Sequence, residues 1–150
     1  RTRFNVEEKP GIILKMLREL NHGKQILIES ELGDNKYVMS DPVKVYQIIH
    51  NILSNAVKVT EDDGIVVVHL RSQSNYLFVE VRDNGVGVPG DLRGRIFKEK
   101  VEGTPGLNGE TSNGMGLFLC AKLSALIGGT ISYSPGNNGG SVFSLKLPRE

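Results

Sequence analysis

One stretch of this chain, residues 41 to 60, restricts the possible folds more than any other. Its apolar residues recur every three or four positions, which predicts a helix with one buried face made of Val45, Ile49, Ile52, Leu53 and Ala56. Asp41 can cap the start of this helix, and Pro42 suits its first turn, where a missing N–H has no intrahelical partner. A polar stripe with the same spacing lies beside the apolar one and consists of Asn51, Asn55 and Lys58.

Length and composition favour one domain that contains all 150 residues. The 18 basic residues are interspersed with 17 acidic ones, so the charge pattern gives no sign of a nucleic-acid-binding surface. The single cysteine, Cys120, is expected to be a small buried apolar residue, and its lack of a partner favours a reducing compartment. No apolar run is long enough to cross a bilayer, and no signal peptide is evident. Because the sequence does not begin with Met, we expect a domain excised from a longer protein.

The remaining elements alternate irregularly between helices and strands. Residues 5 to 22 have helix-like spacing, and residues 115 to 127 are apolar on nearly all sides, which predicts a buried helix. Strand character is found at 25–32, 37–39, 65–71, 76–82, 130–133 and 141–147. Because strand pairs are adjacent in sequence, the pattern predicts an α/β fold. We expect a two-layer sandwich in which a mixed, mostly antiparallel sheet is covered on one face by about three helices.

Two polar side chains are expected to point into the apolar layer. Asp83 has the same parity as the apolar residues of the strand that precedes it, and Ser141 has that of the apolar residues of the last strand. A buried carboxylate requires a hydrogen-bond donor, and the exocyclic amine of adenine is a donor of suitable size. Ser141 can join that network directly or through water. Taken alone, Asp83-Asn84-Gly85 is also a common turn sequence, so a structural role is the alternative.

Groups suited to phosphate and magnesium occur in two other places. Residues 114–117 open the second apolar helix, where free amide protons and the positive end of the helix dipole favour phosphate. Asn51 and Asn55 offer amide oxygens to Mg²⁺, which prefers few protein ligands together with phosphates, and Lys58 offers an ammonium group. Each feature is weak alone, because many helices begin with glycines and many carry solvated Asn and Lys residues. Together they are chemically sufficient for handling a nucleotide.

In order and spacing, these motifs resemble the ATP-binding catalytic domain of sensor histidine kinases. That domain shares a superfamily with DNA gyrase, heat-shock chaperones and MutL-type repair ATPases. The matching motifs are an asparagine box at 50–58, a first glycine box at 83–89, a phenylalanine box at 95–97, a second glycine box at 113–117 and a last glycine motif at 139–143. The resemblance covers roughly residues 5 to 148 and implies the ATP-binding fold of the superfamily, known as the Bergerat type.

The resemblance implies a role for each matched position in the adenine half of the site. Asp83 is expected to bind the adenine amine, while Gly85 and Gly87 let the backbone pass close to the base. Further nucleotide contacts are implied for Phe97, Gly114, Met115, Gly116, Leu117 and Ser141. Residues 98–113 are expected to form a mobile lid over the nucleotide.

In the phosphate half, the resemblance implies that Asn55 holds Mg²⁺ with Asn51 beside it and that Lys58 contacts phosphate. Asn51, Lys58 and the neighbouring His50 are the implied catalytic positions. For His50, a role as a surface or structural residue is an equal alternative.

The resemblance also implies partners. The γ-phosphoryl group is expected to pass to a histidine on a separate dimerisation domain and then to an aspartate of a response regulator. None of His22, His50 and His69 lies in the usual acceptor motif, so we expect the acceptor upstream of residue 1. The implied setting is cytoplasmic, within a homodimeric parent protein whose attachment to the inner or plasma membrane stays open.

Several positions depart from the family pattern. Residues 98–100, Lys-Glu-Lys, stand where a second aromatic residue is usual, Ser112 replaces a glycine, and Val59 replaces an aromatic residue. None of these changes removes an adenine or magnesium contact, so we expect ATP binding to survive. Lid docking is expected to differ, and lid geometry governs how the γ-phosphate is presented.

Three functions follow from these observations. The leading hypothesis is the ATP-binding half of an autophosphorylating histidine kinase. The altered lid motivates an alternative, a degenerate kinase domain that serves as a nucleotide-binding or protein-interaction module. A gyrase- or chaperone-type ATPase is disfavoured, because those branches carry a catalytic glutamate where Asn51 stands.

Overall fold

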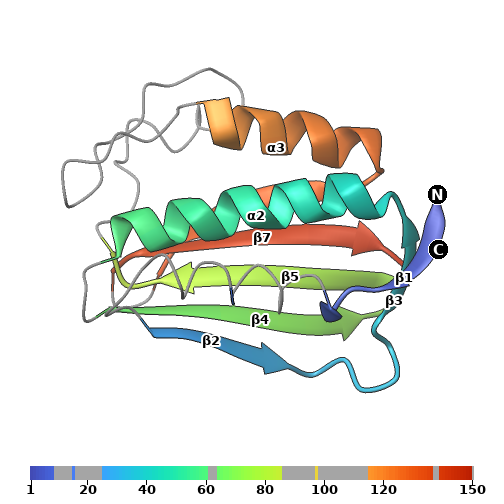
Figure 1. Cartoon of the computed structure of the whole chain (residues 1–150), viewed down its shortest axis with the longest axis horizontal. Coiled ribbons are helices and arrows are strands. Elements are labelled where there is room, and N and C mark those ends of the chain that lie inside the picture. Colours follow the sequence, from blue (N-terminus) through green and yellow to red (C-terminus); the bar gives the residue numbers. More distant parts are fainter. Residues whose placement is uncertain are drawn as a thin grey trace.

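The computed structural model describes residues 1–8, 15, 25–60, 64–85, 97, 115–136 and 139–149. Its main layer is a five-stranded sheet in the order β2-β4-β5-β7-β6 (Figure 1). The strands are β2 (Gln25–Ser30), β4 (Ile65–Gln73), β5 (Tyr76–Asp83), β6 (Thr130–Pro135) and β7 (Ser141–Pro148). β2 runs parallel to β4, and the other neighbouring pairs are antiparallel. The predicted mixed, mostly antiparallel sheet is therefore confirmed.

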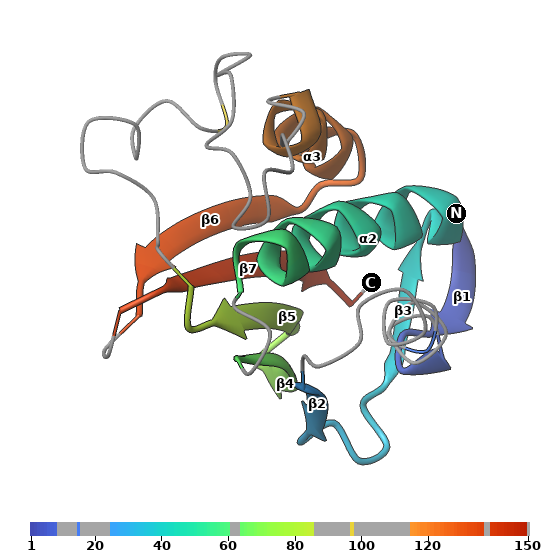
Figure 2. The same cartoon turned by 60° about the vertical axis from the view of Figure 1, so that its left-hand side comes forward.

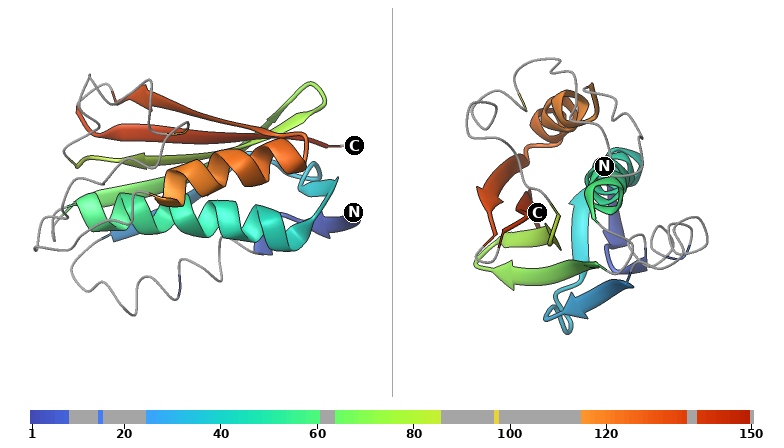
Figure 3. Two further views of the ribbon diagram at one scale, coloured as in Figure 1. Left: turned by 90° about the horizontal axis from the view of Figure 1, so that it is seen from above. Right: turned by 90° about the vertical axis from the view of Figure 1, so that its left-hand side faces the viewer.

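Two helices, α2 (Pro42–Val59) and α3 (Met115–Leu126), lie side by side on one face of this sheet (Figures 2 and 3). This arrangement confirms the predicted two-layer α/β sandwich. α2 begins as its sequence predicts, because the Asp41 side chain accepts the backbone N–H groups of Val43 and Lys44 and Pro42 occupies the first turn.

The core lies between α2 and the inner face of the sheet. The predicted apolar stripe of α2 is completely buried. Alternate residues of the three central strands point toward it and are also buried, namely Val66, Val68, Leu70, Leu77, Val79, Val81, Phe143, Leu145 and Leu147. Apolar burial contributes about 25 cal/mol per Å², so this core is the main source of the domain's stability. It also fixes α2 and the three central strands relative to one another.

α3 is buried on one side only. Cys120 and Ser124 are buried, and the Cys120 thiol points to the Ile48 carbonyl of α2, 3.8 Å away. Elsewhere on α3, the side chains of Leu119 and Leu126 are 46% and 72% exposed. The prediction of a buried helix is therefore wrong for this part of its surface, because α3 lies at the edge of the helical layer. Neither helix of the described part is long and apolar enough to cross a membrane.

A second, two-stranded sheet pairs β1 (Thr2–Asn5) with β3 (Tyr37–Ser40). The apolar segment at 37–39 was expected, whereas no strand was expected at the start of the chain. Thr2 pairs with Ser40, so the partner of β1 is distant in sequence and local periodicity does not reveal it. The helix predicted for residues 5 to 22 lies mostly outside the described residues, although Asn5 belongs to β1.

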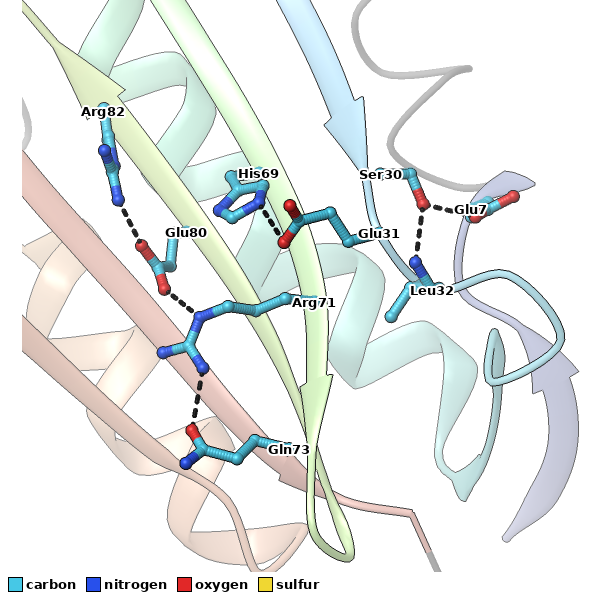
Figure 4. Close-up of polar contacts among 9 residues, drawn as sticks. All are labelled: Glu7, Ser30, Glu31, Leu32, His69, Arg71, Gln73, Glu80 and Arg82. Atoms are coloured by element: carbon cyan, nitrogen blue, oxygen red, sulfur yellow. Dashed lines mark hydrogen bonds and ion pairs between the residues drawn. The ribbon is translucent and has the colours of Figure 1, made fainter.

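The sheet face turned away from α2 and α3 carries charged side chains among apolar ones. Here Glu80 lies between two arginines, since Arg71 Nε donates to its Oε1 at 2.7 Å and an Arg82 guanidinium nitrogen donates to its Oε2 at 3.1 Å (Figure 4). The Arg71 guanidinium also stacks on the Phe78 ring, 4.1 Å from its centroid. Glu80 is consequently only 7% exposed, although no described helix covers this face.

Candidate functional site

Four elements have ends at one end of the sandwich, on the left of Figure 1. α2 and β5 end there, whereas α3 and β7 begin there. Motif residues lie at these ends: Lys58 is in the last turn of α2, and Asp83, Met115 and Ser141 are terminal residues of β5, α3 and β7. Asp83 pairs directly with Ser141 in the register of β5 and β7. The fold therefore brings motif residues from distant parts of the sequence to one place.

Asp83 is only 7% exposed, as its parity in the sequence predicts. Its Oδ1 accepts the backbone N–H of Gly85 at 2.9 Å, and Ser141 lies opposite Asp83 on the neighbouring strand β7. The buried Oδ2 has no hydrogen-bond partner among the described residues. Burial raises the pKa of Asp83 by more than the nearby backbone N–H groups of Gly85 and Ser141 lower it. An unsatisfied carboxylate oxygen in an apolar layer gains from a donor that a ligand supplies.

Gly85 brings the turn after β5 against the end of α2. A Cβ at this position would lie 2.3 Å from the backbone carbonyl oxygen of Val59, so no other residue fits without displacing backbone. Thr60, the residue after α2, is fully buried, and its hydroxyl donates to the Ala56 carbonyl at 2.7 Å. The end of α2 is thereby held firmly beside the turn that carries the Asp83 hydrogen bond.

The polar stripe of α2, Asn51, Asn55 and Lys58, is half-buried, and so is the neighbouring His50. Burial raises the pKa of the Cys120 thiol to about 12, so that the thiol stays protonated, and the Asn51 side chain lies near enough to oppose this shift in part. Asn51 therefore lies beside Cys120 of α3. Asn55 and Lys58 lie further along α2, toward the end where Asp83 is found.

A metal ion at this stripe would need oxygen ligands. Among the described residues, no three His, Cys, Asp or Glu side chains gather as potential metal ligands. Asn51 and Asn55 are one helical turn apart and present amide oxygens on the same side of α2. Such neutral oxygens fit Mg²⁺, which takes few protein ligands when phosphate oxygens complete its shell.

Phe97 is packed onto the sheet beside the candidate site. Its ring meets that of Phe143 edge-on, with 6.1 Å between the centroids, and Tyr133 lies 5.2 Å from the same Phe143 ring. Leu117 of α3 also packs against the core. The described contacts of Phe97 and Leu117 are thus apolar, and their direct contact with a nucleotide stays a prediction.

Other predicted site residues cannot be placed. Gly87, Gly114 and the expected lid at 98–113 lie outside the described residues. Met115 and Gly116 open α3, as expected for the second glycine box.

The second described histidine is far from this constellation. His69 lies on the outer face of the sheet, where its Nε2 is 3.1 Å from Glu31 (Figure 4). On the same picture, the hydroxyl of Ser30 donates to Glu7 at 2.6 Å and links β2 to the N-terminal turn. These contacts are structural and lie away from Asp83.

Sequence reasoning did not single out two features of the site. The contact of the Cys120 thiol with the Ile48 carbonyl joins two helices, and only the apolar surroundings of Cys120 hinted that the thiol would be buried. Gly140 lies with φ +77° against the backbone of Asp83, a contact that the Gly139-Gly140 pair before the last strand did not by itself reveal.

Comparison with known proteins identifies the family. A family model described as "Histidine kinase-, DNA gyrase B-, and HSP90-like ATPase" matches residues 40–150. The chain belongs to this ATPase family. The sensor histidine kinase RcsC of Escherichia coli K12 is 38% identical to the ATPase domain over 109 residues, which are 72% of this chain and 11% of RcsC. The sensor histidine kinase TmoS of Ectopseudomonas mendocina is 36% identical over 127 residues, which are 83% of this chain and 13% of TmoS.

Solved structures agree with this assignment. The mycobacterial sensor histidine kinase MprB superimposes with a TM-score of 0.83 at 19% identity, over 98% of this chain and 96% of that one, which shows a shared fold. Full-length ShkA gives a TM-score of 0.83 at 26% identity, over 98% of this chain and 30% of that one. The predicted resemblance to histidine kinase catalytic domains is confirmed. The ATPase domain spans only about a tenth of the length of RcsC and TmoS.

Proposed function

We propose that this ATPase domain binds Mg-ATP and donates the γ-phosphoryl group to a histidine on a separate dimerisation domain of a two-component sensor histidine kinase. The observation that carries the proposal is the buried Oδ2 of Asp83, which has no partner among the described residues and lies where α2, β5, α3 and β7 have their ends. Family membership supports ATP as the nucleotide, and full-length ShkA was solved in complex with AMPPNP.

The adenine ring belongs at Asp83 in this proposal. Oδ2 accepts a hydrogen from the exocyclic amine, while Oδ1 stays bonded to the N–H of Gly85. Ser141 pairs with Asp83 from the neighbouring strand and so holds the backbone that carries the carboxylate. Gly85 and Gly87 let the chain pass close to the base, because neither has a side chain.

The triphosphate extends from there toward the start of α3 and the last turns of α2. Backbone amides of residues 114–117 and the helix dipole attract phosphate oxygens, and Lys58 adds a positive charge. Asn55, with Asn51 beside it, holds Mg²⁺, which neutralises phosphate charge. Phe97 anchors the segment that leads into the lid, residues 98–113.

Transfer then depends on positioning more than on covalent participation of the domain. A nitrogen of the acceptor imidazole attacks the γ-phosphorus in line, the N–P bond forms, and the bond between that phosphorus and the β–γ bridging oxygen breaks as ADP leaves. Asn51 and Lys58 orient and neutralise the phosphates. His50, next to Asn51, lies where it can assist the movement of the imidazole proton.

The partners follow from this chemistry. A dimerisation domain must present the histidine, and a response regulator then receives the phosphoryl group. The solved histidine kinase ThkA, whose fold is shared, was captured in complex with the response regulator TrrA. ATP use also supports a cytoplasmic setting for the domain.

One specific observation favours a second function. Lys98, Glu99 and Lys100 replace the expected aromatic residue after Phe97. If the lid does not close productively, the domain serves as a nucleotide-binding or protein-interaction module. Incubating the longer natural protein with labelled ATP separates the two, because transfer to histidine produces acid-labile, base-stable label, whereas a module without transferase activity produces no covalent label.

Binding itself is tested by calorimetric titration with a non-hydrolysable ATP analogue, with and without Mg²⁺. We expect magnesium-dependent binding that weakens roughly 10- to 100-fold in Asp83→Asn, since a hydrogen bond to a charged group is lost. Absence of binding to the folded wild-type domain would contradict the proposed function.

A further inference from the structure

Gly140 lies in an unusually close contact at the end of β5. It is a buried residue in the turn between β6 and β7, with φ +77°. A Cβ at this position would lie 2.0 Å from the carbonyl oxygen of Asp83 and 3.0 Å from the Cα of Asn84. Neither contact is with the end of a flexible side chain, so a larger residue displaces one backbone segment from the other. The start of β7 is thereby pressed against the residue that carries the unsatisfied carboxylate.

The close approach has a direct effect on the Asp83 side chain. The residue after Gly140 is Ser141, which pairs with Asp83 in the β5–β7 ladder, while the backbone N–H of Gly85 donates to Oδ1 of the Asp83 side chain. Asn84 is fixed as well, because its side-chain oxygen accepts the Ile65 N–H at 3.2 Å. With the backbone on both sides held, the direction of the free Oδ2 is set before any ligand arrives.

We propose that Gly140 is a positioning residue for base recognition, which lets β7 pair closely with the end of β5 and so holds the Asp83 backbone where its carboxylate faces the adenine amine. The inference rests on the proposed function in one respect, namely that Asp83 accepts a hydrogen bond from the adenine amine. It adds that selectivity for adenine depends on a glycine that touches no part of the nucleotide.

The neighbouring glycine provides a matched control. Gly139 has a similar φ of +88°, yet a Cβ there meets nothing within 4 Å. Gly139→Ala and Gly140→Ala therefore impose the same kind of backbone strain, whereas only Gly140→Ala forces the two backbone segments apart. A difference in nucleotide selectivity between the two variants is therefore due to the close contact of Gly140 with Asp83 and not to the replacement of a glycine as such.

The measurement is the ratio of the dissociation constants of Mg-IDP and Mg-ADP, because inosine lacks the exocyclic amine. We expect wild type and Gly139→Ala to favour ADP by roughly 10- to 100-fold, the value of a hydrogen bond to a charged group. In Gly140→Ala we expect the ratio to fall to within about threefold of unity, with phosphate binding retained. Because both nucleotides use the same folded fraction, general destabilisation leaves the ratio unchanged.

The outcomes separate this inference from the proposed function. A wild-type domain without preference for ADP contradicts both, whereas a wild-type preference that Gly140→Ala retains overturns the role of Gly140 alone. If Gly140→Ala does not fold, an NMR pH titration of the wild-type domain decides. The amide resonances of Gly85, Gly140 and Ser141 should then all shift with the titration of the Asp83 carboxyl group, because these three backbone segments lie around it. Gly140 and Ser141 amides that do not respond would overturn the inference.

Discussion

At the scale of single residues, Asp83 is held in an unfavourable state. A carboxylate in an apolar layer is stable only to the extent that donors satisfy it, and here Oδ2 lacks a donor among the described residues. Its folded-state pKa is above its ordinary value of 3.8, mainly because of burial. Ligand-binding sites commonly carry such unsatisfied polar groups, and these groups lower the stability of the protein when the ligand is absent.

Asp83→Asn should therefore separate stability from binding. Since the raised pKa means that the folded state favours the protonated carboxyl group, the stability contribution of Asp83 is present below pH 3.8 and is lost as the pH rises through the folded-state pKa. We expect the variant at pH 7 to have a free energy of unfolding equal to or above that of wild type, and a smaller difference below pH 3.8. Urea unfolding at the two pH values measures this. A large loss of stability at pH 7 would contradict the account.

At the scale of elements, α2 has two functions that its sequence separates cleanly. One side anchors the sandwich, and the polar stripe beside it supplies Asn51, Asn55 and Lys58 to the candidate site. Both stripes follow from a helical period of 3.6 residues, which is why the sequence alone predicted them. Any change that shifts α2 against the sheet must also shift the polar stripe.

Truncation of the buried stripe tests whether this side of α2 anchors the sandwich. Ile52 is completely buried, whereas Val43 on the same helix is 65% exposed. Ile52→Ala should lower the free energy of unfolding by about 2–5 kcal/mol, because a cavity is left in a packed core. Val43→Ala should change it by less than about 0.5 kcal/mol. Denaturant unfolding of both variants is the measurement, and similar losses in the two would show that α2 does not pack as described.

At the scale of the whole molecule, the two faces of the sheet are stabilised by different physics. The inner face is apolar, while the outer face is held by Glu80 and its two arginines. Burial raises the pKa of Glu80, but the hydrogen bonds and charges of Arg71 and Arg82 outweigh it, so that the pKa lies below its ordinary value of 4.5. This contribution to stability is present above pH 4.5 and is lost as the pH falls through the folded-state value.

Glu80→Gln should accordingly lower the free energy of unfolding at pH 7 by about 1–3 kcal/mol, since two arginines lose a charged acceptor. The difference from wild type should shrink below pH 4.5. Glu31→Gln is the control, because the Glu31 side chain is 69% exposed and its contact with His69 should matter little. Thermal unfolding across pH 3 to 7 distinguishes the variants, and a pH-independent effect of Glu80→Gln would argue against an ionic contribution.

Local periodicity explains what could be predicted of this molecule and what could not. The inward orientation of Asp83 and Ser141 followed from strand parity, and the fold class followed from the order of helices and strands. β1 was missed because its pairing with β3 is non-local, and the exposure of Leu126 was missed because composition does not say whether a helix lies at the edge of its layer. The Gly140 contact depends on two strands meeting, which no single segment encodes.

The pairing of β5 with β7 has a consequence for synthesis on the ribosome. β4 and β5 are consecutive and form their hairpin through Ser74 and Asn75, so this pair can assemble as soon as it emerges. Ser141, however, belongs to the last of the described strands and pairs with Asp83 only after the segments between them have been made. In the proposed site, nucleotide would then bind only once β7 has paired with β5, so that it stabilises the finished fold and does not direct its assembly.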